Sequence, residues 1–201
     1  MHTAQRIIHT STELFKKYGL RSVTMDDIAA ELGISKKTIY TYYADKDTLV
    51  QAVMEAQIQH NQTCCDHDKA NAKNALHETY LALAMIQKSM GEMNPSLVND
   101  LKKYYPKPYQ LLEQFRYNYL HKIIKDNIVR GIAEGLYRPD VDVNIITNLR
   151  LESMMLVFEP NFYDSTKHNL YYAEKQLLEH FLYGIATPKG QKIIAKYQQQ
   201  L

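Results

Sequence analysis

The sequence predicts an all-α protein, and three observations point to that fold class. Only 7 of the 201 residues are glycine and 6 are proline, while 45% are hydrophobic, which is enough to form a core. Apolar residues recur at the spacing of helices, and no run alternates as a strand requires. Glycine, proline and helix-capping residues divide this pattern into segments of helical length. The length suits one large domain, or a small domain together with a medium-sized one.

The first expected helix covers residues 4–18 and ends before Gly19. One of its faces is apolar except for a small serine, and its side chains recur at helical spacing, which predicts an amphipathic helix. The residues of this face are Ala4, Ile7, Ile8, Ser11, Leu14, Phe15 and Tyr18.

Residues 24–46, TMDDIAAELGISKKTIYTYYADK, predict two short helices joined by a tight turn. Thr24 is suited to cap the first helix, whose first turn holds two aspartates where the helix dipole favours negative charge. Gly33 ends that helix, and Ser35 caps the next one only two residues later. This arrangement is typical of a helix-turn-helix, whose second helix lies in the major groove of DNA. We therefore expect this segment to bind duplex DNA.

The segment from Thr24 to Leu49 resembles the N-terminal domain of the TetR (tetracycline-repressor-like) family, and the preceding helix fits as well. The resemblance implies a three-helix DNA-binding domain at residues 1–46, with the recognition helix third. It also implies a larger helical domain for effector binding and dimerisation at residues 47–201. Two departures are small: Lys37 stands where a small residue is common, and Tyr43 replaces the more common phenylalanine.

The expected recognition helix presents polar side chains in place of apolar ones. We expect Ile39 and Tyr43 to pack inward, and Lys36, Lys37 and Thr41 to point outward. Lysine can read guanine or hold a phosphate, and the resemblance places several neighbouring residues on phosphates. The expected DNA-binding residues are Thr24, Ser35, Lys36, Lys37, Thr38, Tyr40, Thr41, Tyr42 and Lys46. The alternative is the solvated face of a surface helix, which the complete set of caps in register argues against.

The charge distribution agrees with DNA binding by the first part of the chain. Residues 1–46 hold seven Lys and Arg against five Asp and Glu, whereas residues 47–201 hold seventeen of each. All of the net charge of +2 therefore lies on the expected DNA-binding domain, as an electrostatic footprint requires. Because the excess is small, we expect weak non-specific affinity unless a dimer doubles it.

The remainder of the chain divides into helices at glycine, proline and capping residues. Asn74, Asn94 and Asp142 are expected N-caps, and the polar stretch from Cys64 to Asp68 is an expected break. The expected helices cover residues 46–65, 74–90, 94–105, 109–134, 142–158, 170–186 and 191–197.

Soft metal ligands gather near residue 64, where His60, Cys64, Cys65 and His67 lie close in sequence. They leave open a metal or thiol sensor, although no CxxC pair or second histidine motif supports it. The alternative is an ordinary polar helix end, with no metal bound. Adjacent cysteines rarely form a disulfide, so a reducing cytoplasm is the simplest localisation.

Methionine and aromatic residues are frequent after residue 80, and their adaptable or amphipathic side chains suit a ligand cavity. The expected lining residues are Met85, Phe115, Tyr119, Met154 and Phe158. The alternative for each of them is ordinary core packing. No basic cluster or glycine-rich loop awaits a phosphate, so the expected effector is a small hydrophobic molecule.

The helices at about 142–158 and 170–187 carry more apolar residues than one side of a monomer can cover. We expect them to form a two-fold homodimer, in the isologous manner of most dimers. The expected interface residues are Leu149, Met155, Leu156, Leu177, Leu178 and Phe181.

Other function classes lack their signatures in this sequence. There is no glycine-rich phosphate loop and no nucleophile motif, so we expect no catalytic residue and no cofactor. No stretch reaches the roughly 18 apolar residues of a membrane span, and no leader opens the chain. The sequence is thus interpreted as a regulator, most consistent with a repressor released from a pseudo-palindromic operator by a hydrophobic effector. Two alternatives remain: a regulator whose second domain responds to a protein partner or a metal or thiol signal, and a helical enzyme with a vestigial DNA-binding head.

Overall fold

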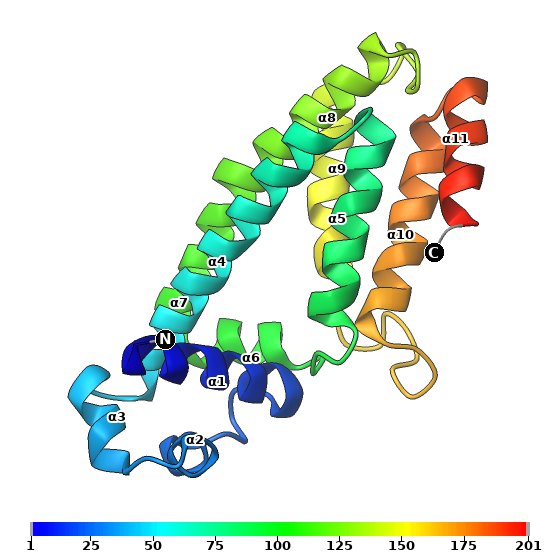
Figure 1. Ribbon diagram of the computed structural model, residues 1–201. Coiled ribbons are helices and arrows are strands. Elements are labelled where there is room, and N and C mark those ends of the chain that lie inside the picture. The colour runs from blue at the N-terminus through cyan, green and yellow to red at the C-terminus, as the bar shows by residue number, and fades with distance from the viewer. Residues whose placement is uncertain (1, 200–201) are drawn as a thin grey trace. The chain divides into compact units, whose positions relative to one another are not determined.

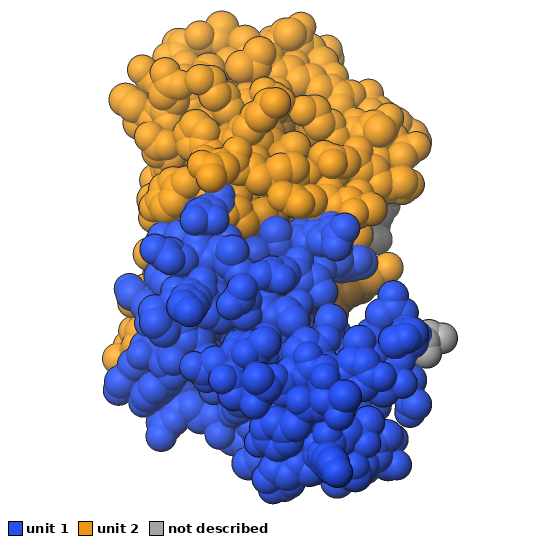
Figure 2. All heavy atoms as spheres, turned by 90° about the vertical axis from the view of Figure 1, so that its left-hand side faces the viewer, with its two compact units in different colours: residues 1–61, 92–114 blue, residues 62–91, 115–201 orange. Residues whose placement is uncertain are grey.

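The computed structural model describes residues 2–199, which fold into α-helices with one π-helical segment (Figure 1). Within this described part no strand forms, and the only sheet-like pairing there is a single antiparallel bridge between Tyr137 and Ala186. The predicted all-α fold class is confirmed. The helices group into two compact units, coloured separately in Figure 2. Unit 1 comprises the residues up to Asn61 together with Glu92–Gln114, and unit 2 comprises Gln62–Gly91 and the residues from Phe115 onward.

Unit 1 begins with the three predicted helices, α1 (Thr3–Tyr18), α2 (Met25–Leu32) and α3 (Lys36–Tyr42). Thr24 caps α2 in a capping box, and Gly33 ends that helix in the left-handed conformation, with φ of +63°. A residue with a side chain would be strained there, which explains glycine in the turn. Ser35 then caps α3 as predicted.

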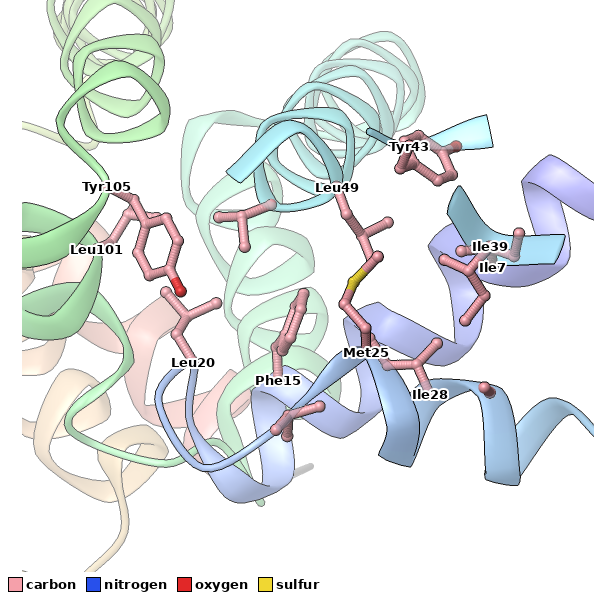
Figure 3. Packing of buried hydrophobic residues seen from close by; sticks show 13 residues of the cluster. Ile7, Phe15, Leu20, Met25, Ile28, Ile39, Tyr43, Leu49, Leu101 and Tyr105 are labelled. Carbon is pink, nitrogen blue, oxygen red and sulfur yellow. The ribbon is translucent and has the colours of Figure 1, made fainter. Parts of the chain in front are cut away.

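One hydrophobic cluster holds unit 1 together (Figure 3). Ile7, Ile28, Ile39 and Leu49 bring α1, α2, α3 and the start of α4 (Lys46–Asn71) into it, and all four side chains are fully buried. Each such side chain contributes about 1.5–3 kcal/mol of transfer free energy. Helices α1, α2 and α3 therefore pack against the first turns of α4. The exposed face of α3 takes no part in this cluster.

Two helices from later in the chain join the same cluster. These are α6 (Leu97–Tyr104) and α7 (Pro106–Gln114), and Leu101 and Tyr105 are their buried contributions. The two compact units therefore do not coincide with the two domains expected from sequence, which meet after Lys46. That functional boundary stays a prediction.

Several predicted helix boundaries were wrong, because the local signals did not decide them. Helix α4 continues through the expected break at Cys64–Asp68 and ends at Asn71, since polar residues without glycine or proline do not stop a helix. Asn94 does not cap α6, because its side-chain oxygen accepts a bond from the amide of Ser96 and the helix begins at Leu97. The expected helix 109–134 begins earlier, at Pro106, because proline is favourable in a first turn.

That long helical stretch is not uniform. After α7 the segment η1 (Phe115–Leu120) adopts a π-helix, and α8 (His121–Ala133) follows it. The terminal helix α11 (Pro188–Gln198) likewise begins before the expected residue 191, with Thr187 as its N-cap and Pro188 in its first turn.

Unit 2 packs α5 (Ala75–Met90), α8, α9 (Val143–Leu156), α10 (Leu170–Ile185) and α11 around a second hydrophobic cluster. Helix α5 contacts α8, α10 and α11, and α9 contacts α8 and α10. Leu76, Leu83, Leu182 and Ile194 are among the fully buried side chains of this cluster.

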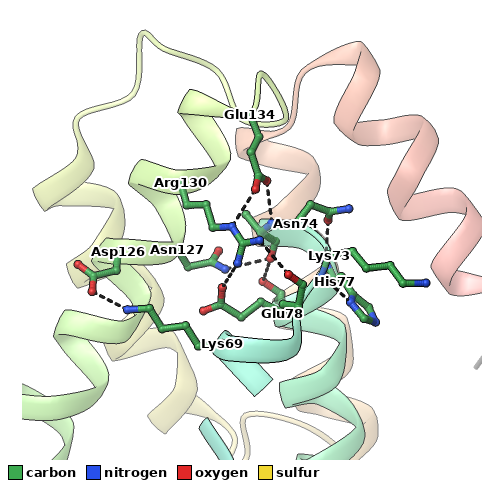
Figure 4. Close-up of polar contacts among 12 residues, drawn as sticks. Lys69, Lys73, Asn74, His77, Glu78, Asp126, Asn127, Arg130 and Glu134 are labelled. Carbon is green, nitrogen blue, oxygen red and sulfur yellow. Dashed lines mark hydrogen bonds and ion pairs between the residues drawn. The ribbon is translucent and has the colours of Figure 1, made fainter. Parts of the chain in front are cut away.

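A partly buried polar network fixes the start of α5 against the end of α8 (Figure 4). The Arg130 guanidinium donates to Glu134 at 2.8 Å, to Glu78 at 3.3 Å and to the Ala72 carbonyl at 2.9 Å. Glu134 in turn accepts a bond from the amide of Ala75 at 2.8 Å. Glu78 is only 6% exposed, and burial raises the pKa of its carboxyl. The arginine therefore compensates a charge that would be costly alone.

Candidate nucleic-acid interface

Helix α3 is fixed by its cap and by two inward residues. The Ser35 hydroxyl accepts a bond from the amide of Thr38 at 3.1 Å, and the two hydroxyls lie 2.8 Å apart. Ile39 is fully buried and Tyr43 nearly so, in the same cluster as α1 and α2. Both inward-facing predictions are thus confirmed by burial. The remaining side chains of this short helix must then project from the surface.

The outward face of α3 carries Lys36, Lys37, Tyr40, Thr41 and Tyr42, all of them exposed. The hydroxyl of Thr41 donates to the Lys37 carbonyl at 3.0 Å, within the same helix. The Lys36 ammonium lies 2.8 Å from an aspartate of α2, Asp26, and this pair raises the pKa of Lys36. Exposed pairs of this kind break readily, so Lys36 can exchange its carboxylate for another acceptor.

Thr24 and Lys46 flank this helix in sequence, and the structure gives each of them an internal partner. The Thr24 hydroxyl donates to the carboxylate of Asp27 at 2.7 Å. The Lys46 ammonium donates to the Leu20 carbonyl and lies 5.8 Å from the centre of the Phe15 ring. Burial lowers the pKa of Lys46. Lys46 therefore ties the first turn of α4 to the end of α1, and two of its three N–H donors remain for a phosphate.

Sequence reasoning missed the residue that starts α4. The Asp45 carboxylate accepts bonds from both the amide and the hydroxyl of Thr48, each at 2.7 Å. These bonds lower the pKa of Asp45. An aspartate directly before the first residue of an expected helix is the available sequence signal, because aspartate is as favourable an N-cap as threonine.

The charge of unit 1 as a whole differs from that of residues 1–46. Unit 1 holds ten Lys and Arg and ten Asp and Glu, because Asp47 and Glu55 offset the net charge of +2 on residues 1–46, while Glu92–Gln114 holds three residues of each sign. The net positive charge expected for the DNA-binding part therefore applies to residues 1–46 and not to the whole compact unit. Positive charge is concentrated locally, on the exposed lysines of α3 and on residues of α6.

The five residues expected to line a cavity all belong to unit 2. Phe115 and Tyr119 stack in η1 with ring centres 5.5 Å apart. The Tyr119 hydroxyl donates to Asp66 at 2.6 Å and to the Gln62 carbonyl at 3.1 Å. The other three come from α5, from α9 and from the turn after α9: Met85 and Met154 are half-buried, and Phe158 is buried. Their role as lining residues stays a prediction.

The residues expected at a dimer interface differ in their exposure. Leu149 is 57% exposed and Leu156 is also exposed. They lie on one face of α9 together with Ile145, which is 65% exposed. Leu178 is the exception, because it is 4% exposed and packs into the core of its own unit, so its assignment to the interface was wrong. The remaining members, Met155, Leu177 and Phe181, are half-buried.

The soft ligands near residue 64 lie within α4. Cys64 and Cys65 form no disulfide within residues 2–199, and burial raises the pKa of the Cys65 thiol to about 11, which disfavours the reactive thiolate. His67 lies 3.5 Å from Asp68. Among residues 2–199, no group of three or more His, Cys, Asp or Glu side chains is placed to hold a metal ion. The same residues contain no helix with the length and apolar character of a membrane span.

Comparison with known proteins connects this geometry to a family. Residues 7–53 match the family described as bacterial regulatory proteins, tetR family. The HTH-type transcriptional regulator YvaF of Bacillus subtilis is 38% identical over 112 residues, which are 55% of this chain and 58% of that protein. The HTH-type transcriptional repressor KstR2 of Mycobacterium tuberculosis is 23% identical over 150 residues, covering 70% of this chain and 72% of KstR2.

Solved structures share the fold. The ketosteroid transcriptional regulator KstR2 matches with a TM-score of 0.59 at 18% identity, over 93% of this chain and 97% of that one. A TetR-family transcriptional regulator from Agrobacterium tumefaciens matches with a TM-score of 0.74 at 15% identity, over 92% and 97% of the two chains. The capped α2 and α3 lie inside the matched residues, so residues 7–53 form a DNA-binding domain of the TetR family of bacterial regulatory proteins.

Proposed function

We propose that this protein is a DNA-binding transcriptional regulator that acts as a repressor, with α3 as its reading helix. The observation that carries the proposal is the exposed face of α3, where Lys37, Tyr40 and Tyr42 project from a helix anchored by buried Ile39. Lysine can contact guanine or phosphate, and tyrosine hydroxyls can bond to phosphates. Two copies would place their α3 helices in successive major grooves of a pseudo-palindromic operator.

Hydroxyl-radical footprinting of bound genomic fragments tests this proposal. We expect two protected segments about 10 base pairs apart from centre to centre, or a multiple of that spacing, because successive major grooves on one face repeat once per helical turn. Protection without a pair of related half-sites would argue against a two-fold reader.

The proposed dimer forms through α9 and α10 of unit 2. Its support is the exposed apolar row of Ile145, Leu149 and Leu156 on α9, together with Tyr172 and Tyr183 exposed on α10. A monomer leaves these side chains in water, whereas a two-fold contact buries the same face of both copies.

Replacing Ile145 and Leu149 with aspartate is expected to convert the dimer to a monomer, because like charges would then meet across the two-fold axis without solvent. Sedimentation should change from twice the chain mass to 23.4 kDa at micromolar protein. Val129→Asp is the matched control, since Val129 is similarly exposed on α8, and it should leave the dimer intact. A monomeric wild-type protein would refute the interface outright.

We propose that the effector is a small hydrophobic molecule bound in unit 2. The support for this proposal is the set of methionine and aromatic residues in that unit. KstR2, which shares the fold, is a ketosteroid regulator by its name, and a steroid is an apolar molecule of the expected class. An effector can release the operator only by binding the DNA-incompetent state better than the competent one. The protein would perform this function in the cytoplasm.

A panel of steroids and other apolar compounds added to the operator complex tests the effector proposal. We expect at least one compound to release the DNA, and Met154→Ala to raise the concentration needed for release at least about tenfold while leaving DNA affinity unchanged, because even one methylene lost from a hydrophobic pocket costs about 1–3 kcal/mol. Operator binding that no compound relieves would favour a regulator responding to a protein partner, or to a metal or thiol signal.

A further inference from the structure

An exposed tyrosine of α6 holds two cations from different parts of unit 1. The Tyr104 ring is 40% exposed, and its centre lies 5.0 Å from the Arg21 guanidinium carbon and 5.2 Å from the Lys103 ammonium. Both cations are themselves exposed. Each is attracted to the ring, because the face of an aromatic ring is electronegative. The ring thus holds a pair of cations at the surface, one from the segment after α1 and one from α6.

No carboxylate neutralises this pair within the described chain. None of the ion pairs among residues 2–199 includes Arg21, Lys103 or the neighbouring Lys102, which is exposed and lies 6.0 Å from the ring centre of Tyr109. The acidic residue of α6, Asp100, instead accepts a bond from the Ser96 hydroxyl at 3.3 Å. Cations without carboxylate partners are available to an external anion.

Both cations come from segments of unit 1 that adjoin residues proposed to contact phosphates. Arg21 follows Leu20, whose carbonyl accepts the bond from Lys46, and it precedes Thr24 by three residues. Tyr104 precedes Tyr105, which lies beside Leu20 and Leu101 in the core of unit 1 (Figure 3). Burial of Leu20, Leu101 and Tyr105 in one cluster therefore brings Lys103 and Arg21 to the same ring, and Arg21 is three residues from Thr24 in sequence.

We propose that Arg21 and Lys103, held on Tyr104, bind the phosphate backbone of duplex DNA beside the operator half-site, with Lys102 adding to the local potential. The inference rests on the proposed DNA-binding function and extends the interface to α6. A guanidinium and an ammonium held on the same ring suit the phosphate backbone, because arginine offers a planar fork and lysine a point charge. Backbone contacts of this kind add affinity without reading sequence.

The test is the salt dependence of operator binding by the double variant Arg21→Ala, Lys103→Ala, measured by fluorescence anisotropy between about 50 and 200 mM salt. A two-fold complex loses one phosphate contact per subunit, so the slope of log affinity against log salt should become shallower by about 2. We expect affinity about tenfold weaker at the lowest salt and an unchanged preferred sequence.

Two controls separate a local contact from other causes. Lys192→Ala, Lys196→Ala removes the same charge from exposed positions of α11 in unit 2, and its slope should equal that of the wild type. Arg21→Lys, Lys103→Arg keeps both charges and should keep the slope, which excludes loss of folding as the cause. An unchanged slope in the alanine variant, or an equal change in the α11 variant, overturns the inference while leaving the proposed function standing. A wild-type protein that binds no duplex DNA overturns both.

Discussion

Replacing Lys36 and Lys37 with alanine is expected to abolish operator binding while leaving the thermal unfolding curve nearly unchanged. Both side chains are exposed on α3 and neither contributes to the core of unit 1. Each lost base contact weakens binding by about 5- to 150-fold, and a two-fold complex loses every contact twice. The fold tolerates the change because the Lys36–Asp26 pair is solvent-exposed and stabilises little.

The single variants should differ in a way that the structure specifies. The bond to Asp26 competes with any contact of Lys36 to DNA, whereas Lys37 forms no ion pair within residues 2–199. We therefore expect Lys37→Ala to weaken binding more than Lys36→Ala. Mobility-shift titration of both, with circular-dichroism melts as the folding check, measures this. A double variant that shifts the operator at wild-type protein concentration would mean that α3 is not the reader.

Replacing Arg130 with methionine is expected to destabilise the protein by about 3–5 kcal/mol, because it leaves the buried carboxylate of Glu78 without its cation. Urea unfolding at neutral pH measures the loss. Burial already raises the pKa of Glu78 above its ordinary value, and removing the arginine raises it further. The destabilisation is therefore complete above that raised pKa, and it shrinks as the pH falls and the carboxyl takes up a proton.

The double variant Arg130→Met, Glu78→Met provides the control for this pair. Replacing both partners with apolar residues removes the uncompensated charge, so much of the lost stability should return. Glu134 lies on the other side of Arg130 and is more exposed, so it should tolerate the loss of its partner. If the single Arg130 variant unfolds at the wild-type urea concentration, the network does not stabilise the junction between α5 and α8.

The helix-turn-helix could be predicted from sequence because its signals are local. The Thr24 cap acts on Asp27 and the Ser35 cap on Thr38, three residues away in each case. Gly33 in its left-handed conformation is equally a matter of one residue. Such contacts do not depend on the rest of the fold, so the pattern of capping residues alone located α2 and α3.

The contacts that sequence reasoning did not find depend on residues far apart in the chain. Lys46 finds its acceptor at Leu20, 26 residues earlier, and no spacing rule identifies that carbonyl. Helical periodicity placed Leu178 on an apolar face of its helix. It could not show that other helices of the same unit cover this residue. The membership of α6 in unit 1 follows from burial of Leu101 and Tyr105 beside α1. That packing also brings the Tyr104 ring within 5.0 Å of the Arg21 guanidinium.

Selection of bound duplexes from a random-sequence pool by the wild-type protein is the most direct measurement of its proposed role. Because we propose that α3 contacts bases and that α9 packs against a second copy, the enriched sequences should contain two inverted half-sites about one helical turn apart, or a multiple of it. The Lys36→Ala, Lys37→Ala variant should enrich none of them. A pool that emerges from repeated rounds without any shared sequence would contradict specific DNA recognition by α3.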